Sequence, residues 1–512
     1  MKNTLFLLFQ CPILLILGIM LILGSVPFSS AQVHYLGNGS PWNQKSETGP
    51  DAVVGGWYYN LGVTGIRVEL VADKPKYLLV KYVFPRSPAD GKISPGDLII
   101  GVNNELFNTE HKNGYGMDKF GADGPVLDFA IALENCQNTS AMGALSVTLD
   151  RRGATENVLL NIGHQSGTYG QNFPFDCKKT NLIRDQLYQY LVDHQGEDGS
   201  WGIPPQNTFA PLALLASGEK RYLDAVKKNV KMHARTTSSE DSSWLINWRY
   251  MSAAIVMSEY YLFTREKWVL KEIQEVYEFL VSTQYIDMNQ INEKVKETHP
   301  HAYPKDKMDS HGGWGHNPGF EGYGPISMLT AQGALAFSLM HRCGIDVDPD
   351  RHVAAYNFLR RSAGANGYVW YKDQPAGPND WADMGRTGAS AIAHQLSPYQ
   401  GNEHSKFAFL QAKVIGQHPQ SFPDTHGSPI MGMGYTAIGA NVDSDCFRQL
   451  MEANRWWFTL AQCPDGSFYY QPNRDNAGYG SDSRIAATAV TAFIFSIPKG
   501  NLHLTRKKIS NR

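Results

Sequence analysis

The chain has 512 residues, which is too long for one ordinary domain, and 42% of them are hydrophobic while 18% are charged. This composition supports large cores and argues against global disorder. The formal net charge is −2 and the cationic cluster Arg506-Lys507-Lys508 lies in the tail, so nucleic acid is not an expected partner.

The first residues have the pattern of an export signal. Lys2 precedes an apolar segment from Leu5 to Leu23, and small residues follow at Ser29-Ser30-Ala31. This order is typical of a signal peptide, residues 1–31, that is cleaved after Ala31. We therefore expect an exported protein, periplasmic or secreted. The segment is also long enough to span a bilayer, so membrane association is expected only if it stays uncleaved.

A small β-rich domain is predicted over residues 56–165, after a linker rich in Gly, Asn, Ser and Pro at residues 32–55. Ile66 to Leu70 alternates between apolar and polar side chains, as a half-buried strand does. Residues 77–83 form an apolar run typical of a buried strand. A helix from Leu127 to Leu133 and two closing strands complete the prediction.

The segment SPADGKISPGDLIIGVNN, residues 87–104, resembles the PDZ domain family. That resemblance implies that the loop before the second strand, here Leu61, Gly62 and Val63, binds the carboxylate of a peptide C-terminus. In such a domain the peptide adds to the edge of a sheet. The alternative is a structural PDZ-like module that packs on its neighbour.

From Cys177 to Pro498 two kinds of helix alternate at a spacing of about fifty residues. Amphipathic segments that end in turns are Ile183–Gln195, Val269–Gln284, His352–Ser362 and Phe447–Gln462. Segments that are apolar or small on most faces are Phe209–Ser217, Trp244–Phe263, Gly324–Met340, Gly385–Gln395, Gly432–Ala440 and Ser483–Ile497. A helix that is apolar all round is buried, whereas an amphipathic one is peripheral. The alternation predicts an (α/α)6 toroid over residues 177–498, followed by a basic tail at residues 499–512.

The turns Gln195 to Trp201 and Gln462 to Phe468 share the pattern Gln-x-x-x-Gly-x-aromatic. They resemble the repeat motif of squalene-type cyclases, and the whole region resembles toroids of the terpenoid cyclase and protein prenyltransferase superfamily. Polysaccharide lyases and several glycoside hydrolases use the same toroid. The order of PDZ domain and toroid is also similar to that of a family of exported bacterial proteins of unknown function. Such resemblances imply a fold, and the reaction has to be argued from the site.

Loops that enter the inner helices should meet at one mouth of the toroid, and the richest of them is Met308 to Pro318, MDSHGGWGHNP. The candidate catalytic residues are His311, Asp309, His316, Asp383, Arg386, Tyr435 and Asp482. The candidates for substrate binding are Trp244, Asn247, Arg249, Trp314 and Tyr323. Asp309, His311 and His316 could also hold zinc, although a glycine-rich loop lacks the regular spacing of a helical site. Each of these residues could instead cap a turn or fill a core.

A mixture of acids, His, Tyr, Arg and Trp around a cavity suits sugar chemistry. Tyr or His can abstract the proton next to a uronate carboxyl while Arg neutralises that carboxyl, and two carboxylic acids can instead act across a glycosidic bond. The leading hypothesis is thus a polysaccharide lyase or glycoside hydrolase, or a protein that binds the polysaccharide. In it, Tyr435 or His311 transfers the proton.

Two alternatives stay open. One is a non-catalytic scaffold protein whose PDZ module binds a peptide C-terminus. The other is an enzyme similar to a terpenoid cyclase that acts on an apolar substrate. Asp443-Ser444-Asp445-Cys446 resembles the cyclase acid motif but lacks its final Asp. A ring filled by bulky apolar side chains would count against an enzyme.

Overall fold

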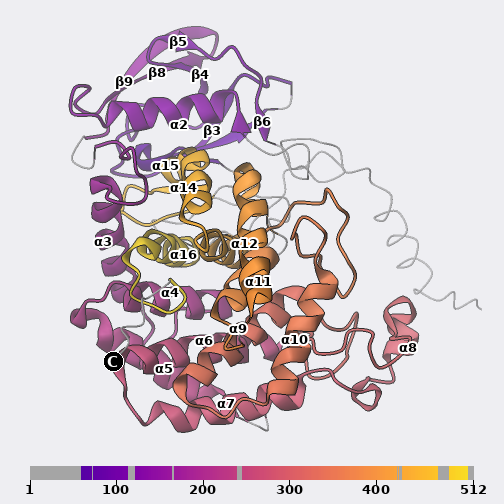
Figure 1. Cartoon of the computed structure of the whole chain (residues 1–512). Helices are drawn as coiled ribbons and strands as arrows, with labels where there is room; N and C mark the ends of the chain where they lie inside the picture. Colours follow the sequence, from indigo (N-terminus) through magenta and orange to yellow (C-terminus); the bar gives the residue numbers. More distant parts are fainter. Residues whose placement is uncertain are drawn as a thin grey trace, which may run out of the picture.

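The computed structural model describes residues 59–505, except 72, 114–121, 164–166, 239–240, 242–244, 400, 424, 426–428 and 471–483. A small antiparallel sheet with one helix lies at one end of a large helical body (Figure 1). The predicted signal peptide, the linker and the cationic cluster of the tail lie outside the described residues. No helix of the described part is both long and apolar enough to cross a membrane.

The sheet has the strand order β1-β2-β3-β4-β8-β9, with β5 paired to β4, and every pair is antiparallel. Its strands are β1 (Tyr59–Asn60), β2 (Ile66–Leu70), β3 (Leu78–Val83), β4 (Leu98–Val102), β5 (Glu105–Leu106), β8 (Ala144–Arg151) and β9 (Ala154–Asn161). A separate pair joins β6 (Lys112–Asn113) to β7 (Ala122–Asp123). Helix α2 (Pro125–Cys136) contributes Phe129 and Leu133 to the core beneath the sheet.

The helical body contains a closed ring of inner helices: α4 (Pro204–Ala216), α6 (Ile246–Thr264), α9 (Ser327–Cys343), α11 (Gly385–Leu396), α13 (Pro429–Ala440) and α16 (Arg484–Ser496). Each inner helix packs against the next in this order, and α16 packs back against α4. Outside them lie α3 (Lys178–Asp193), α5 (Leu223–Thr236), α7 (Val269–Thr283), α10 (Pro349–Ser362), α12 (Asn402–Gln417), α14 (Ser444–Ala453) and α15 (Arg455–Ala461). The predicted toroid of six inner helices is confirmed.

Short helical turns complete the chain. They are η1 (Gly62–Thr64), η2 (Lys220–Tyr222), η3 (Met288–Gln290), α8 (Val295–Thr298), η4 (Pro300–Ala302), η5 (Pro419–Ser421) and η6 (Ile497–Lys499). Three of them, η3, α8 and η4, lie on the long connection between α7 and α9, which projects from the ring (Figure 1).

Two outer helices, α5 and α12, were not singled out by the sequence pattern, and the segment 447–462 is divided between two helices. Asn454 ends α14, since its side-chain amide donates to the carbonyl oxygens of Leu450 at 2.7 Å and Pro419 at 2.8 Å. The acidic pair before this break is structural. Asp443 caps α14 by accepting hydrogen bonds from the N–H groups of Asp445 and Cys446.

Small residues let the inner helices approach closely. A Cβ atom added at Gly388 of α11 would lie 2.1 Å from the carbonyl oxygen of Tyr435 in α13, so no larger residue fits there. The middle of the ring of helices is filled by aromatic side chains. The centre of the Phe209 ring lies 5.7 Å from that of Tyr435 and 5.3 Å from that of Phe493. This filling counts against an enzyme that binds its substrate in the middle of the ring, so any space for a ligand must lie at an end of the toroid.

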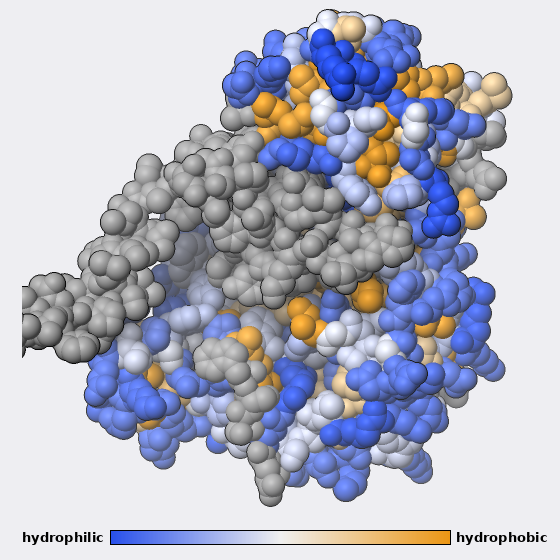
Figure 2. Space-filling view, turned by 180° about the vertical axis from the view of Figure 1, so that it is seen from behind, coloured by the Kyte–Doolittle hydropathy of each residue, from blue (hydrophilic) through white to orange (hydrophobic). Residues whose placement is uncertain are grey.

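The two domains share a buried contact. Leu460 of α15 belongs to the core of the sheet domain, and the guanidinium of Arg67 lies 4.9 Å from the ring centre of Phe84 and 4.3 Å from that of Tyr469. All five residues of β2 are buried, and Arg67, which the alternating pattern assigned to solvent, contacts Tyr469 of the toroid. On the face shown in Figure 2, hydrophobic residues gather on the sheet domain, while the helical body is mostly hydrophilic.

The loop predicted to bind a peptide terminus lies in this contact. Leu61 is fully buried, and a Cβ atom at Gly62 would lie 2.7 Å from the carbonyl oxygen of Thr459 in α15. The edge of β2 next to the loop is already paired with β1. Leu61, Gly62 and Val63 therefore do not form an open carboxylate-binding groove, which corrects their assignment as peptide-binding residues.

Lys179 is a buried cation in the same contact. Its Nζ donates to Gln137 Oε1 at 2.5 Å, and burial lowers its pKa from the ordinary 10.5 to about 8. Between these pH values the folded protein binds fewer protons than the unfolded chain, so stability rises with pH, by at most about 1.4 kcal/mol per pH unit. We predict that Lys179→Met removes this rise in urea unfolding at pH 7.5, 9 and 10. The exposed Lys271→Met is the control, and equal slopes in wild type and Lys179→Met would contradict the prediction.

Candidate functional site

A cavity of about 920 Å³ lies where loops enter the inner helices. Its walls come from the starts of α4, α6, α9, α11 and α13, from the connection before α9, and from the loop before α11. The lining residues are Ile203, Pro204, Pro205, Leu245, Ile246, Trp248, Arg249, His299, His316, Asn317, Glu321, Gly322, Tyr323, Ile326, Met328, Tyr371, Asp383, Arg386 and Met431. Five residues predicted from the sequence are among them, namely Arg249, His316, Tyr323, Asp383 and Arg386.

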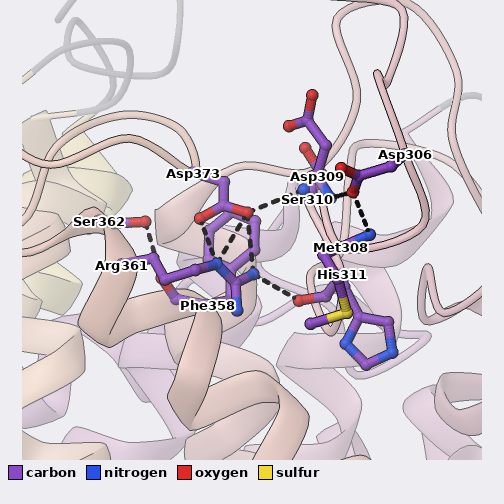
Figure 3. Close-up of polar contacts among 9 residues, drawn as sticks. All are labelled: Asp306, Met308, Asp309, Ser310, His311, Phe358, Arg361, Ser362 and Asp373. Atoms are coloured by element: carbon purple, nitrogen blue, oxygen red, sulfur yellow. Dashed lines mark hydrogen bonds and ion pairs between the residues drawn. The ribbon is translucent and has the colours of Figure 1, made fainter.

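His311 and Asp309 lie elsewhere, on the side of the loop that faces α10 (Figure 3). Arg361 pairs with Asp373 through Nε and Oδ1 at 2.8 Å and donates through Nη2 to the carbonyl oxygen of His311 at 2.8 Å. Asp373 also accepts from the N–H of Ser310 at 2.8 Å. The His311 ring points away from this carboxylate (Figure 3), and burial, with the charge of Arg361, lowers its pKa. These contacts, made by backbone atoms of Ser310 and His311, anchor the loop on α10, and His311 is not among the residues that line the cavity.

The zinc hypothesis is wrong because Asp309 and His311 lie away from His316. His316 lines the cavity, whereas Asp309 accepts from the N–H of Lys305 at 3.2 Å and His311 lies beside Arg361. Among the described residues no group of three or more His, Cys, Asp or Glu side chains is placed to hold a metal ion. Asp309, His311 and His316 therefore do not converge on one point.

Three other candidates are buried outside the cavity. The indole of Trp314 donates to the carbonyl oxygen of Leu280 at 2.9 Å, and Asn247 donates to the carbonyl oxygens of Gly315 at 2.9 Å and Asn317 at 3.1 Å. Both side chains hold the loop in shape. Tyr435 is 2% exposed and lies in the filled middle of the ring. Trp244 and Asp482 lie outside the described residues, so their predicted roles stay predictions.

A chain of hydrogen bonds runs along the polar wall. The Nε1–H of Trp248 donates to Nδ1 of His316 at 2.8 Å, and Nε2 of His316 bonds to the hydroxyl of Tyr323. The hydroxyl groups of Tyr323 and Tyr371 are 3.1 Å apart. An indole nitrogen can only donate, so Nδ1 of His316 must be the acceptor and its single proton sits on Nε2. His316 is therefore a fixed donor to Tyr323.

Tyr371 supplies a second donor. Burial and then the hydrogen bond with Tyr323 raise its pKa well above the ordinary value, so it keeps its proton. When both neighbours donate, the oxygen of Tyr323 accepts two hydrogen bonds. That arrangement fixes the position of the Tyr323 oxygen at the cavity wall.

A buried ion pair joins Asp383 to Arg386 beside this chain. Arg386 also donates through Nη2 to the hydroxyl of Tyr368 at 2.8 Å, and its guanidinium carbon lies 5.5 Å from the ring centre of Tyr371. Burial alone would lower the pKa of Arg386, but the charge of Asp383 and the interactions with Tyr368 together outweigh burial, so the pKa is raised. The cation at this wall is therefore permanent.

The sequence pattern missed Trp248, Tyr371 and His299. Trp248 follows Leu245 by three residues and precedes Arg249, and all three line the cavity while Asn247 points into the loop. Helical spacing of three and four residues places side chains on one face, so this spacing was a usable signal. Tyr371 and His299 carry no such signal, because each belongs to an irregular connection.

Residues 180–505 match the profile of a family described as Domain of unknown function (DUF6288). No curated protein matches the chain.

Solved structures similar to the chain include an inactive variant of the α-1,6-mannanase GH76A of Salegentibacter sp. HEL1_6 in complex with α-1,6-mannotriose (12% identity, 62% of this chain and 99% of that chain, TM-score 0.41). A family 76 glycoside hydrolase from a bovine Bacteroides thetaiotaomicron strain is 11% identical over 70% of this chain and 84% of that chain, with a TM-score of 0.42. The type II terpene cyclase MstE from Scytonema is 13% identical over 62% of this chain and 99% of that chain, with a TM-score of 0.38. At such identities and scores these proteins do not indicate the reaction of this chain.

Proposed function

The chain belongs to the family described as Domain of unknown function (DUF6288). From the residues of the cavity, we propose that the mouth of the toroid binds an acidic polysaccharide and cleaves it by β-elimination. The observation that carries this proposal is the chain of hydrogen bonds from Trp248 through His316 and Tyr323 to Tyr371. It leaves Tyr323 as the cavity residue best prepared to transfer a proton. This assignment replaces Tyr435 and His311, the groups favoured by the sequence.

In the proposed reaction the ionised oxygen of Tyr323 removes the proton at C5 of a uronate. The electron pair of that C–H bond forms the C4=C5 double bond as the C4–O bond breaks, and the Tyr323 hydroxyl then returns the proton to the departing oxygen. The Nε2–H of His316 and the hydroxyl of Tyr371 hold the Tyr323 oxygen in place for both proton transfers. Arg249 and Arg386 line the same cavity, paired with Asp241 and Asp383, and the uronate carboxylate is proposed to bind beside these two cations.

A panel of acidic polysaccharides tests the reaction. Elimination creates a conjugated double bond, so the purified protein should raise ultraviolet absorbance with at least one polymer of the panel. Newly formed reducing ends should appear in equal number. An unchanged absorbance across the panel would remove the lyase proposal.

Hydrolysis is the second candidate, because two carboxylates, Glu321 and Asp383, both line the cavity. A glycoside hydrolase needs one such group as acid and another as base or nucleophile. Asp383 is already engaged by Arg386 in a buried ion pair, and we therefore rank hydrolysis second. New reducing ends without ultraviolet absorbance would identify a hydrolase.

We also propose that the sheet domain is an exported PDZ-like module with a structural role. The segment 87–104 supports the PDZ-like assignment, and the buried loop at Leu61 and Gly62 supports a fixed attachment to α15. The leader at residues 1–31 supports export.

Trp248→Phe tests how the tautomer of His316 is set. The change removes the donor to Nδ1 but keeps an aromatic ring, so we predict a mixture of His316 tautomers and elimination slowed about tenfold. Nitrogen-15 NMR of the imidazole reports the tautomers. Trp268→Phe is the control, since it removes an indole donor to Glu266 at the surface. An unchanged His316 spectrum in Trp248→Phe would contradict the prediction.

A further inference from the structure

The cavity has one apolar wall that the proposed reaction does not use. The starts of α4 and α13 contribute Ile203, Pro204, Pro205 and Met431, whereas the loop before α9 and the start of α11 contribute His316, Glu321, Tyr323, Asp383 and Arg386. The lining from α4 and α13 is therefore apolar, whereas α6, α9, α11 and the loops before them contribute both polar and apolar residues. A sugar alone would leave much of the apolar sector in contact with water, which is unfavourable.

Two apolar residues at this rim are exposed and also break local rules of helix formation. Ile203 is 45% exposed and occupies the N-cap of α4, where Ser, Thr, Asp or Asn is preferred. Leu245 is 39% exposed and occupies the N-cap of α6 with a left-handed backbone, φ 60°, which is unfavourable for a branched side chain. Its N–H donates to Asn317 Oδ1 at 2.9 Å, and this bond helps to hold that conformation.

Neither residue belongs to the hydrophobic core of the helical body, and both are exposed large apolar side chains. Departures from local preference without a gain in stability are expected where a ligand binds. Helices α4 and α6 are neighbours in the ring, so the two side chains extend one apolar sector to the edge of the cavity.

We propose that the substrate is an amphiphilic glycan, an acidic sugar that carries an acyl or alkyl chain, and that the chain binds along Ile203, Leu245 and Met431. The identity of the sugar half rests on the proposed function. The apolar half rests on the rim residues alone. The acidic sugar binds at the wall that contains Tyr323 and Arg386, and the acyl or alkyl chain extends from the sugar toward α4 and α6.

A series of alkyl glucuronides tests the proposal by calorimetric titration of the full protein. Affinity should rise from methyl to butyl to hexyl β-glucuronide, by up to about fourfold for each methylene that leaves water. Ile203→Ser and Leu245→Asn should abolish this rise and leave the affinity for methyl glucuronide unchanged. Both variants are expected to fold, since Ser is a preferred N-cap residue and Asn tolerates a left-handed backbone.

Val353→Ser is the matched control, because Val353 is an exposed apolar residue of the outer helix α10. Equal affinity for all three glucuronides, or a rise that persists in both rim variants, would overturn the proposal. If the protein catalyses elimination but its affinity for the glucuronides does not depend on the length of the alkyl chain, only this inference is wrong. If affinity rises with the length of the alkyl chain but neither elimination nor hydrolysis is detected, the inference is supported and the proposed reaction is wrong.

Discussion

Replacing Tyr323 by phenylalanine is expected to slow the elimination by about 10²- to 10⁴-fold, the usual contribution of a general acid or base. The change removes the one oxygen that bonds to both His316 and Tyr371. The ring remains, so packing on the cavity wall is kept. Initial rates of ultraviolet absorbance at saturating polymer measure the effect, and binding of methyl glucuronide should change little.

Tyr435→Phe is the matched control for this experiment. The same hydroxyl is deleted, but Tyr435 lies in the filled middle of the ring, where its oxygen has no hydrogen-bond partner among the described residues. We expect full activity and a stability equal to or slightly above that of the wild type, because an unsatisfied buried hydroxyl is costly. Full activity in Tyr323→Phe would contradict the role proposed for Tyr323. Loss of activity in Tyr435→Phe would support Tyr435, the residue favoured by the sequence, as the proton-transfer group.

The contrast between His311 and His316 shows why the sequence located the loop but not which of its side chains faces the cavity. Both residues belong to one glycine-rich segment, five positions apart. Their directions are set by partners far along the chain, Arg361 and Asp373 for His311, and Trp248 for His316. A single sequence does not show these pairings. It shows only that polar and aromatic residues precede an inner helix.

The ring of inner helices was predictable because buried helices are composed mainly of apolar or small residues. The apolar or small-residue segments that became α4, α9 and α11 are buried along almost their whole length, as a helix surrounded by helices requires. The attachment of the sheet domain left no such mark. Gly62 and Leu61 have the same appearance in a peptide-binding loop and in a loop covered by α15, so only the structure separates the two cases.

Replacing Asp383 by asparagine should lower the free energy of unfolding by about 3–5 kcal/mol, the cost of leaving one partner of a buried ion pair uncompensated. Asp383 is 3% and Arg386 6% exposed, and asparagine keeps the size of the side chain while removing its charge. The guanidinium of Arg386 would then be buried with the neutral partners Tyr368 and Val369. Urea unfolding at pH 7 measures the loss.

Two further variants distinguish a buried charge from a lost contact. Glu275→Gln breaks the exposed pair with Lys271 and should cost less than about 0.5 kcal/mol. The double variant Asp383→Asn with Arg386→Met removes both charges and should recover a large part of the stability lost in Asp383→Asn, since an apolar side chain needs no counter-ion. A double variant no more stable than Asp383→Asn would show that the arginine's bonds to Tyr368 and Val369, rather than the compensation of its charge, hold the start of α11 in place.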